Sequence, residues 1–237
     1  MKFYPHHLSF EVTRRCNLCC KHCMRGEAQC LDMDLSYVDK VLDDIAGLYY
    51  INFTGGEPSL NNTCIKAIIN KIIERKIKVY GFDIVTNGVD LDKVLELVEI
   101  LNEFKSYCYS NDKDTSRLAI SGDSFHKSVT LPTVATNFEF SYKKDIEDIL
   151  DLGRAKSLNI QKVNKEDIDI VYRNWGSSGD ILMLNNSIVV SANGDIHLTV
   201  DYEYDSQDGV LGNISNNSLS DIIMSTIDKQ NERHKYW

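Results

Sequence analysis

Two periodicities of apolar side chains alternate along the first half of the chain. Residues 8–13 alternate between apolar and polar side chains, which is the period of a strand with one buried face. Apolar residues three or four positions apart then form helical stripes, and each stripe is followed by another short apolar run. Strands are predicted at residues 8–13, 49–53, 78–85 and 118–121, and helices at residues 35–45, 65–73, 91–101 and 143–152. This alternation indicates βα units on a parallel sheet.

Short polar residues mark the ends of these predicted helices. Either Asp34 or Ser36 is placed to cap the first helix, and Asp90 is placed to cap the third. Gly153 is expected to end the fourth helix, because glycine tolerates the left-handed backbone that commonly closes a helix.

The pattern changes after residue 155. Two strand-like segments flank Asn193-Gly194, a dipeptide typical of two-residue hairpin turns. The last helix is expected to begin at Ser218, with Asp221 three residues later in the arrangement of a capping box. We therefore divide the chain into a parallel barrel core, residues 1–155, and residues 156–237, which hold the last barrel elements and a C-terminal extension.

Composition and charge narrow the choice of partners. The 237 residues are 43% hydrophobic, enough to bury a core, yet no apolar run is long enough to span a membrane. The N-terminus lacks the pattern of a signal peptide, so we expect a cytoplasmic protein. The formal net charge of −9 argues against broad binding to nucleic acid or to an anionic membrane, because both require a basic surface.

The cysteines indicate a metal site. Five of the seven fall between positions 16 and 30, and the total is odd in a chain without an export signal. This distribution is unlike a disulfide framework. The seven residues are Cys16, Cys19, Cys20, Cys23, Cys30, Cys64 and Cys108.

Cys16, Cys20 and Cys23 have the spacing C-x3-C-x2-C. Three thiolates on one short loop can bind three irons of a four-iron cluster and leave the fourth iron open to an outside ligand. Cys19 allows a second interpretation, with two abutting C-x2-C pairs around zinc. We favour iron–sulfur, because structural zinc sites normally separate their two pairs by a longer stretch of chain.

Chemically distinctive residues also follow the later strands. Gly55, Gly56 and Glu57 end the second strand, and a carboxylate there can accept hydrogen bonds from a cationic amine. The further candidates are Asn87 after the third strand, Ser121, Asp123 and His126 after the fourth, and Arg154 near the end of the core. Active sites of (β/α) barrels lie at the C-terminal ends of the strands, so we expect these residues at one rim.

Three polar residues are expected inside the barrel. Glu11, Asn52 and Asp83 fall within the first three predicted strands, although strands of a parallel sheet are usually apolar on both faces. We therefore predict that some of the three line a polar lumen.

Over residues 8 to 126 these motifs resemble the radical S-adenosylmethionine (SAM) superfamily. The resemblance rests on the cysteine spacing, on Asn17 and the aromatic His22 within it, and on the Gly-Gly-Glu segment. It implies a partial (β/α)6 TIM-like barrel in which Cys16, Cys20 and Cys23 hold one [4Fe-4S] cluster. The open iron of such a cluster chelates SAM, and one electron then releases a 5′-deoxyadenosyl radical that takes a hydrogen atom from the substrate.

The resemblance also implies how the protein contacts SAM. It places His22 near the adenine, and Gly55, Gly56 and Glu57 at the methionine amino group. It further places Ser121 and Asp123, after the fourth strand, near the ribose and Arg154 at the carboxylate, and it counts Asn87 among the cofactor-binding residues.

The branch that is most similar contains molybdenum-cofactor cyclases and peptide-modifying enzymes, whose C-terminal extensions usually carry cysteines for auxiliary clusters. No cysteine follows Cys108, so we expect a single cluster and doubt a cyclase activity. The expected partners are a peptide or small-molecule substrate and an electron donor such as flavodoxin or ferredoxin. A non-catalytic iron–sulfur module and a glycyl-radical-enzyme activase stay open as alternatives.

Overall fold

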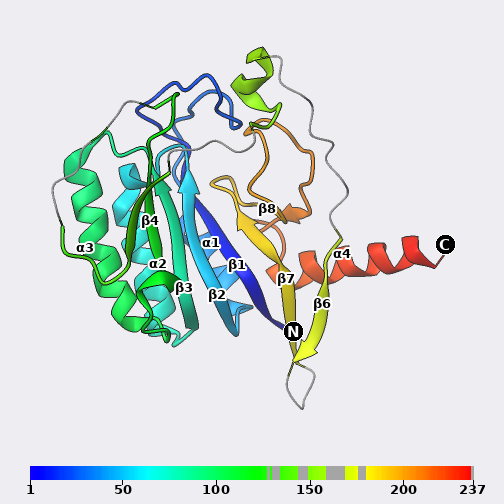
Figure 1. Ribbon diagram of the computed structural model, residues 1–237. Coiled ribbons are helices and arrows are strands. Elements are labelled where there is room, and N and C mark those ends of the chain that lie inside the picture. Colours follow the sequence, from blue (N-terminus) through cyan, green and yellow to red (C-terminus); the bar gives the residue numbers. More distant parts are fainter. Residues whose placement is uncertain (127–128, 130–133, 144–148, 159–168, 176–179, 236–237) are drawn as a thin grey trace.

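The computed structural model describes residues 1–126, 129, 134–143, 149–158, 169–175 and 180–235 (Figure 1). Its centre is an unclosed sheet in which strands β1 to β5 lie side by side in the order of the chain. All four neighbouring pairs among them are parallel. The five strands are β1 Lys2–Thr13, β2 Gly47–Gly55, β3 Lys78–Thr86, β4 Arg117–Ser121 and β5 Glu139–Lys143.

Three helices follow strands of this sheet and cover its outer face (Figure 1). They are α1 Leu35–Asp43, α2 Asn62–Glu74 and α3 Leu91–Tyr107. Beneath them Phe10 of β1 pairs in register with Phe53 of β2, and both side chains are fully buried. The predicted caps are confirmed: Asp34 accepts a hydrogen bond from the backbone of Ser36, and Asp90 caps α3.

Strand β1 begins six residues earlier than its sequence pattern predicts. The added residues pair with a strand from the other end of the chain, β7 Ile181–Val190, which lies parallel to β1 on the side away from β2. Phe3 is fully buried there. The sixth parallel strand therefore adds beside β1 and does not follow β5.

Strand β5 was not predicted. Residues 139–143 pair in parallel with β4, so the expectation of a helix beginning at residue 143 is wrong at that position. The remainder of that predicted helix falls largely on residues 144–148, which lie outside the described residues. The strand is short and mostly polar, and the fully buried Phe138 immediately precedes it. Its pairing depends on β4, which no local pattern reveals.

The predicted hairpin is confirmed. The β7 strand turns through Asn193-Gly194 into β8 Asp195–His197, and Gly194 has a left-handed φ of 88°. Strand β9 Gly212–Asn213 then adds to β8. Helix α4 Leu219–His234 begins with the expected capping box between Ser218 and Asp221. A further strand, β6 Tyr172–Trp175, pairs antiparallel with the start of β7.

Three short 3-10 helices complete the described chain. They are η1 Pro58–Asn61, η2 Lys113–Thr115 and η3 Gly153–Leu158. The η3 helix stands beside the loop that follows β1 (Figure 1), and η1 comes shortly after the C-terminal end of β2.

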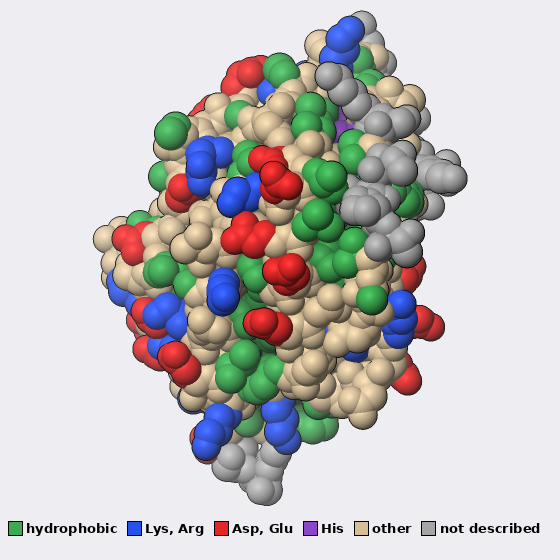
Figure 2. Space-filling view, turned by 90° about the vertical axis from the view of Figure 1, so that its left-hand side faces the viewer, with side chains coloured by type: hydrophobic (Ala, Val, Ile, Leu, Met, Phe, Trp, Pro, Cys, Tyr) green, Lys and Arg blue, Asp and Glu red, His purple; other side chains and the backbone are tan. Residues whose placement is uncertain are grey.

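The surface carries charged side chains of both signs. On the face shown in Figure 2, acidic and basic side chains are interspersed and do not separate into large fields of one sign. Among the described residues, no helix is both long and apolar enough to cross a membrane.

Candidate functional site

A cavity of about 640 Å³ opens at the C-terminal ends of the parallel strands. The structure brings all eleven residues of the predicted site to its wall: Cys16, Cys20, His22, Cys23, Gly55, Gly56, Glu57, Asn87, Ser121, Asp123 and Arg154. His126 also lines it. The rule that barrel strands present their chemistry at the C-terminal ends thus describes where these side chains meet; their individual roles stay predictions.

The cysteines divide into two groups by position. Cys16, Cys20 and Cys23 are partly buried and face the cavity, whereas Cys19 and Cys30 are exposed. All seven cysteines are free thiols. A turn between Cys20 and Cys23 is closed by a hydrogen bond of 3.2 Å from the backbone N–H of Cys23 to the carbonyl of Cys20.

Burial raises the pKa of two of the cavity thiols. For Cys20 the neighbouring thiols of Cys16 and Cys23 raise the pKa further, while the Arg154 guanidinium opposes them. The pKa of Cys16 is likewise raised mainly by burial, against a hydrogen bond from the backbone of Leu18. Because the charged forms of Cys16 and Cys20 are disfavoured, a cation that binds these thiolates would stabilise them.

The arrangement of the three cavity cysteines can be compared with that of a single-ion site. Zinc bound to thiolates at about 2.3 Å would draw the sulfurs to within roughly 4 Å of each other. Among the described residues, the one group of three potential ligands with atoms all within 4.8 Å is His22, Asp123 and His126. The sulfurs of the three cavity cysteines do not all lie within that distance of one another, so they do not form a ready-made site for a single ion.

The two glycines after β2 permit close packing against the cysteine loop. A Cβ on Gly55 would lie 2.0 Å from the carbonyl oxygen of Thr13, and one on Gly56 would lie 2.3 Å from that of Arg15. The backbone of Gly56 donates to Thr13, and that of Glu57 donates to Arg15. Both glycines also line the cavity. The absence of a side chain at these two positions therefore lets the cysteine loop pack closely and lets a ligand approach the backbone.

Glu57 has a different environment from the one expected of a side chain that awaits an amine. Its side chain is buried, and one carboxylate oxygen accepts from the Thr86 hydroxyl at 2.6 Å and from the backbone of Ser59 at 3.1 Å. The other oxygen accepts from the backbone N–H of Asn87 at 2.7 Å. Glu57 therefore ties the end of β2 to the end of β3 at the wall of the cavity.

Asn87 extends this connection to the cysteine loop. Its amide nitrogen donates to the Asn17 side chain at 2.7 Å, and its oxygen accepts from the backbone of Val89 at 3.0 Å. The first cysteine of the motif is therefore held, through its neighbour Asn17, by the third strand.

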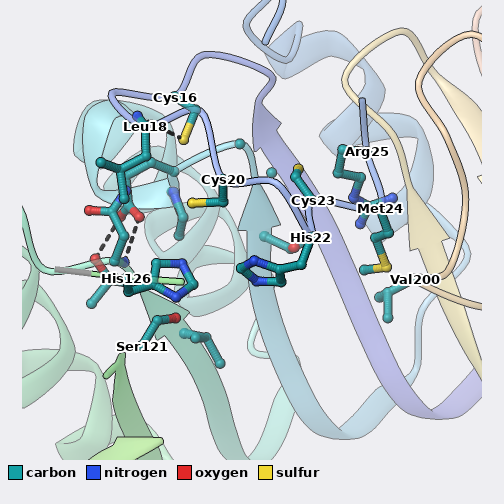
Figure 3. A pocket seen from close by; sticks show the side chains of 18 of the residues that line it. Cys16, Leu18, Cys20, His22, Cys23, Met24, Arg25, Ser121, His126 and Val200 are labelled. Atoms are coloured by element: carbon teal, nitrogen blue, oxygen red, sulfur yellow. Dashed lines mark hydrogen bonds between the residues drawn. The ribbon is translucent and has the colours of Figure 1, made fainter. Parts of the chain in front are cut away.

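Aromatic rings gather at the end of β4 (Figure 3). The His22 ring lies 4.5 Å from that of Phe125 and 5.1 Å from that of His126, measured between centroids. His126 is itself held by the Asp123 carboxylate, whose two oxygens both lie 2.8 Å from Nδ1. Burial lowers the pKa of His22, and His126 lowers it further, so the neutral ring is favoured. Its buried Nδ1 has no hydrogen-bond partner among the described residues.

Arg154 makes contacts that the sequence did not reveal. Its Nε donates to the carbonyl of Cys20 at 2.9 Å, and its backbone N–H donates to the carbonyl of Cys23 at the same distance. Its guanidinium also pairs with Glu27 at 3.2 Å. The preceding Gly153 packs directly against the loop backbone. We call Gly153 and Arg154 the loop brace.

The three polar residues predicted for the lumen have separate positions. Asn52 lines the cavity. Glu11 is fully buried and pairs with Arg14 at 3.0 Å, and Asp83 pairs with the half-exposed Arg117 at 2.8 Å. One polar lumen residue is thus available to a ligand, while the other two carboxylates are neutralised within the protein.

The donor set fits an iron–sulfur cluster and SAM. Three thiols that converge on one cavity supply the soft ligands that iron–sulfur clusters require. The half-buried glycine backbone, and the His22 ring nitrogen that has no partner among the described residues, are polar groups of a kind that a bound nucleotide or amino acid can satisfy.

Comparison with known proteins decides the family. A family model described as the radical SAM superfamily matches residues 10–163. The chain belongs to the radical SAM superfamily. This family implies SAM and an iron–sulfur cluster as cofactors.

Two curated relatives extend the comparison. The chain is 29% identical over 183 residues to an uncharacterized protein of Methanocaldococcus jannaschii, an alignment that covers 65% of this chain and 61% of the relative. It is 36% identical over 111 residues to molybdenum cofactor biosynthesis protein 1 of Dictyostelium discoideum, which covers 40% of this chain and 16% of the relative. The match spans less than two thirds of the length of either relative.

Solved structures confirm the partial barrel. The structure of BtrN in complex with AdoMet and 2-DOIA is similar with a TM-score of 0.54 at 18% identity, covering 96% of this chain and 87% of BtrN. The structure of His6-tagged anSMEcpe with bound AdoMet is similar with a TM-score of 0.51 at 15% identity, covering 95% of this chain and 80% of anSMEcpe. At such low identity these similarities show the fold alone.

Proposed function

We propose that this enzyme cleaves SAM reductively at a single [4Fe-4S] cluster held by Cys16, Cys20 and Cys23. The resulting 5′-deoxyadenosyl radical would take a hydrogen atom from a peptide or a small molecule. The observation that carries the proposal is the meeting of three free thiols and of the residues after β2, β3 and β4 at one cavity.

The chain's own residues would hold SAM and exclude water. The cysteine thiolates would bind iron, and Gly55 and Gly56, which line the cavity, would face the methionine end of SAM. His22 offers a neutral aromatic face beside Phe125 for the adenine. Ser121 and Asp123, at the end of β4, offer polar groups to the ribose.

Arg154 supports the proposal in a different way from the one first expected. Its contacts with the carbonyl groups of Cys20 and Cys23 suit a role in shaping the cluster loop. Because it also lines the cavity, a contact with the SAM carboxylate remains part of the proposal.

A single cluster is supported by where the other four cysteines lie. Cys64 and Cys108 are buried in the hydrophobic core, and burial raises the pKa of both thiols to about 12. Such protonated thiols are poor metal ligands. Cys19 and Cys30 are exposed on the cluster loop, which is therefore reachable from outside by an electron donor such as flavodoxin or ferredoxin.

The direct test is product formation. The chain would be reconstituted anaerobically with iron and sulfide, reduced, incubated with SAM, and assayed for 5′-deoxyadenosine by chromatography. We expect about four irons per chain and the nucleoside as product. A variant with Cys16, Cys20 and Cys23 all changed to alanine should give neither, while Cys19→Ala should give both.

The alternatives predict other results. A cluster that forms but leaves SAM intact under strong reductant would indicate a non-catalytic iron–sulfur module. Zinc in place of iron would contradict the proposal outright. If the nucleoside forms only beside a glycyl-radical enzyme, whose glycyl signal appears with it, the chain would be an activase.

A further inference from the structure

Two arginines are buried near the mouth of the barrel, and they differ in how fully they are bonded. Arg14 and Arg25 expose only 4% and 5% of their surface. The guanidinium of Arg14 donates to four acceptors: Glu11 at 3.0 Å, the Gln29 side chain at 2.9 Å, the carbonyl of Tyr204 at 3.3 Å and the Asn193 side chain at 3.2 Å. Its charge is neutralised by Glu11, so Arg14 serves the fold.

Arg25 is held in place but mostly unpaired. Within the described part of the chain its guanidinium makes one hydrogen bond, from Nη1 to the carbonyl of Tyr202 at 3.2 Å. A guanidinium carries five N–H groups. Among the described residues the buried Nη2 has no hydrogen-bond partner and no carboxylate forms an ion pair with Arg25.

Aromatic rings and a backbone hydrogen bond hold the Arg25 guanidinium in a fixed position, although burying an unpaired charge is unfavourable. Its Cζ lies 3.9 Å from the centre of the Tyr202 ring and 5.9 Å from that of Tyr204. The backbone of Tyr204 also donates to the carbonyl of Arg25 at 3.1 Å. Burying a cation without a counter-charge is unfavourable, so an arrangement that fixes one beside a cavity suits a ligand that supplies the anion.

The position of Arg25 separates it from the expected SAM contacts. Arg25 and Met24 lie beyond His22 toward Val200, whereas Ser121 and His126 lie on the other side of His22 (Figure 3). The Asp201 carboxylate also lines the cavity and accepts from the Thr199 hydroxyl at 3.1 Å. The wall with Arg25 thus belongs to the part of the cavity that the C-terminal extension closes.

We propose that Arg25 binds an anionic oxygen group of the substrate, a carboxylate or a phosphate, through its free N–H groups. This inference rests on the proposed function, because it places the substrate beside a SAM held by the residues of β2, β3 and β4. The guanidinium would orient the substrate by one charged end. Arg25 is a binding residue in this account and takes no part in forming the radical.

The experiment compares three probes that share one ring: benzoate, phenyl phosphate and the neutral benzamide. Binding to the cluster-loaded, oxidised protein with saturating SAM is measured by saturation-transfer NMR. Arg25→Gln is compared with wild type and with Lys156→Gln, which removes an exposed cation that pairs with Glu203. Iron content and SAM affinity are measured for every variant.

Wild type should bind benzoate or phenyl phosphate at least about tenfold more tightly than benzamide, since charge-assisted hydrogen bonds discriminate by that order. Whichever anion binds more tightly identifies the substrate group as carboxylate or phosphate. Arg25→Gln should abolish the preference with iron content and SAM affinity unchanged, and Lys156→Gln should keep it.

Equal binding of all three probes by wild type, or a preference that survives in Arg25→Gln, would overturn the inference. So would a loss of SAM affinity in Arg25→Gln, because it would assign the arginine to the cofactor. If that variant does not fold, a crystal structure of wild type with the tighter anion decides, and an anion bound away from Arg25 refutes the proposal. Failure to load iron or bind SAM in wild type would instead count against the proposed function.

Discussion

Replacing Gly153 by alanine tests whether the loop brace holds the cluster loop in place. Gly153 has a left-handed φ of 55°. An alanine Cβ there would lie 2.5 Å from the backbone nitrogen of Gly26, 2.6 Å from the carbonyl oxygen of Met24 and 2.7 Å from that of Cys23. Real Cβ contacts essentially never fall below 3.0 Å, and every one of these neighbours is backbone. The loop must therefore move.

The loss of stability expected for Gly153→Ala has two parts. A left-handed backbone costs an L-residue roughly 1–2 kcal/mol, and forcing atoms into a packed site costs roughly another 1–3 kcal/mol. Gly209 supplies the matched control, since its φ of 74° is also left-handed but nothing lies within 4 Å of the place that an alanine Cβ would take. Gly209→Ala should therefore show the backbone part alone.

Two measurements on the same preparations decide the matter. Urea unfolding of the metal-free chains should place Gly153→Ala below Gly209→Ala by about 1–3 kcal/mol. After anaerobic reconstitution, Gly153→Ala should hold less iron than Gly209→Ala, because the carbonyl groups of Cys20 and Cys23 lose their fixed partner. Equal stability and equal iron content in the two variants would refute the brace.

Two further substitutions test other parts of the site. Glu57→Gln places an amide donor among three donors, so the free energy of unfolding should fall by about 2–3 kcal/mol; a fall below about 0.5 kcal/mol in urea unfolding would show that the carboxylate does not join β2 to β3. His22→Phe should weaken the pH dependence of stability. The pKa of His22 is lowered in the fold, so the unfolded chain takes up its proton first and stability declines as the pH falls through about 6.5. Thermal unfolding of both proteins between about pH 8 and pH 5 checks this, and identical profiles would contradict it.

Local patterns were sufficient to place the site but not to describe its bonding. The glycines and the cysteine loop come at the ends of strands, and parallel strands present their C-terminal ends at one rim. Residues that follow four different strands could therefore be predicted to lie close together. The contacts of Glu57 depend on Thr86, 29 residues away, and those of Arg154 on Cys20, 134 residues away. No periodicity encodes such pairs.

Strand β5 and the role of Arg25 were missed for the same reason, because both depend on residues that are distant in the sequence. Strand β5 is mostly polar, and its pairing partner β4 decides its conformation. Arg25 stands two residues after Cys23 in the sequence, yet its state depends on Tyr202, 177 residues away. A search for the cluster motif ends at Cys23 and therefore overlooks Arg25. The burial of Arg25 is seen only in the folded protein, in which Tyr202 of the C-terminal part packs against it.

The most direct test of the central claim is the electron paramagnetic resonance spectrum of the reduced, reconstituted chain, recorded with and without SAM. The account predicts one cluster signal that changes shape when SAM is added and is absent from the variant lacking Cys16, Cys20 and Cys23. A signal that SAM leaves unchanged, or one that persists in that variant, would contradict the assignment of these thiols and of the cavity beside them.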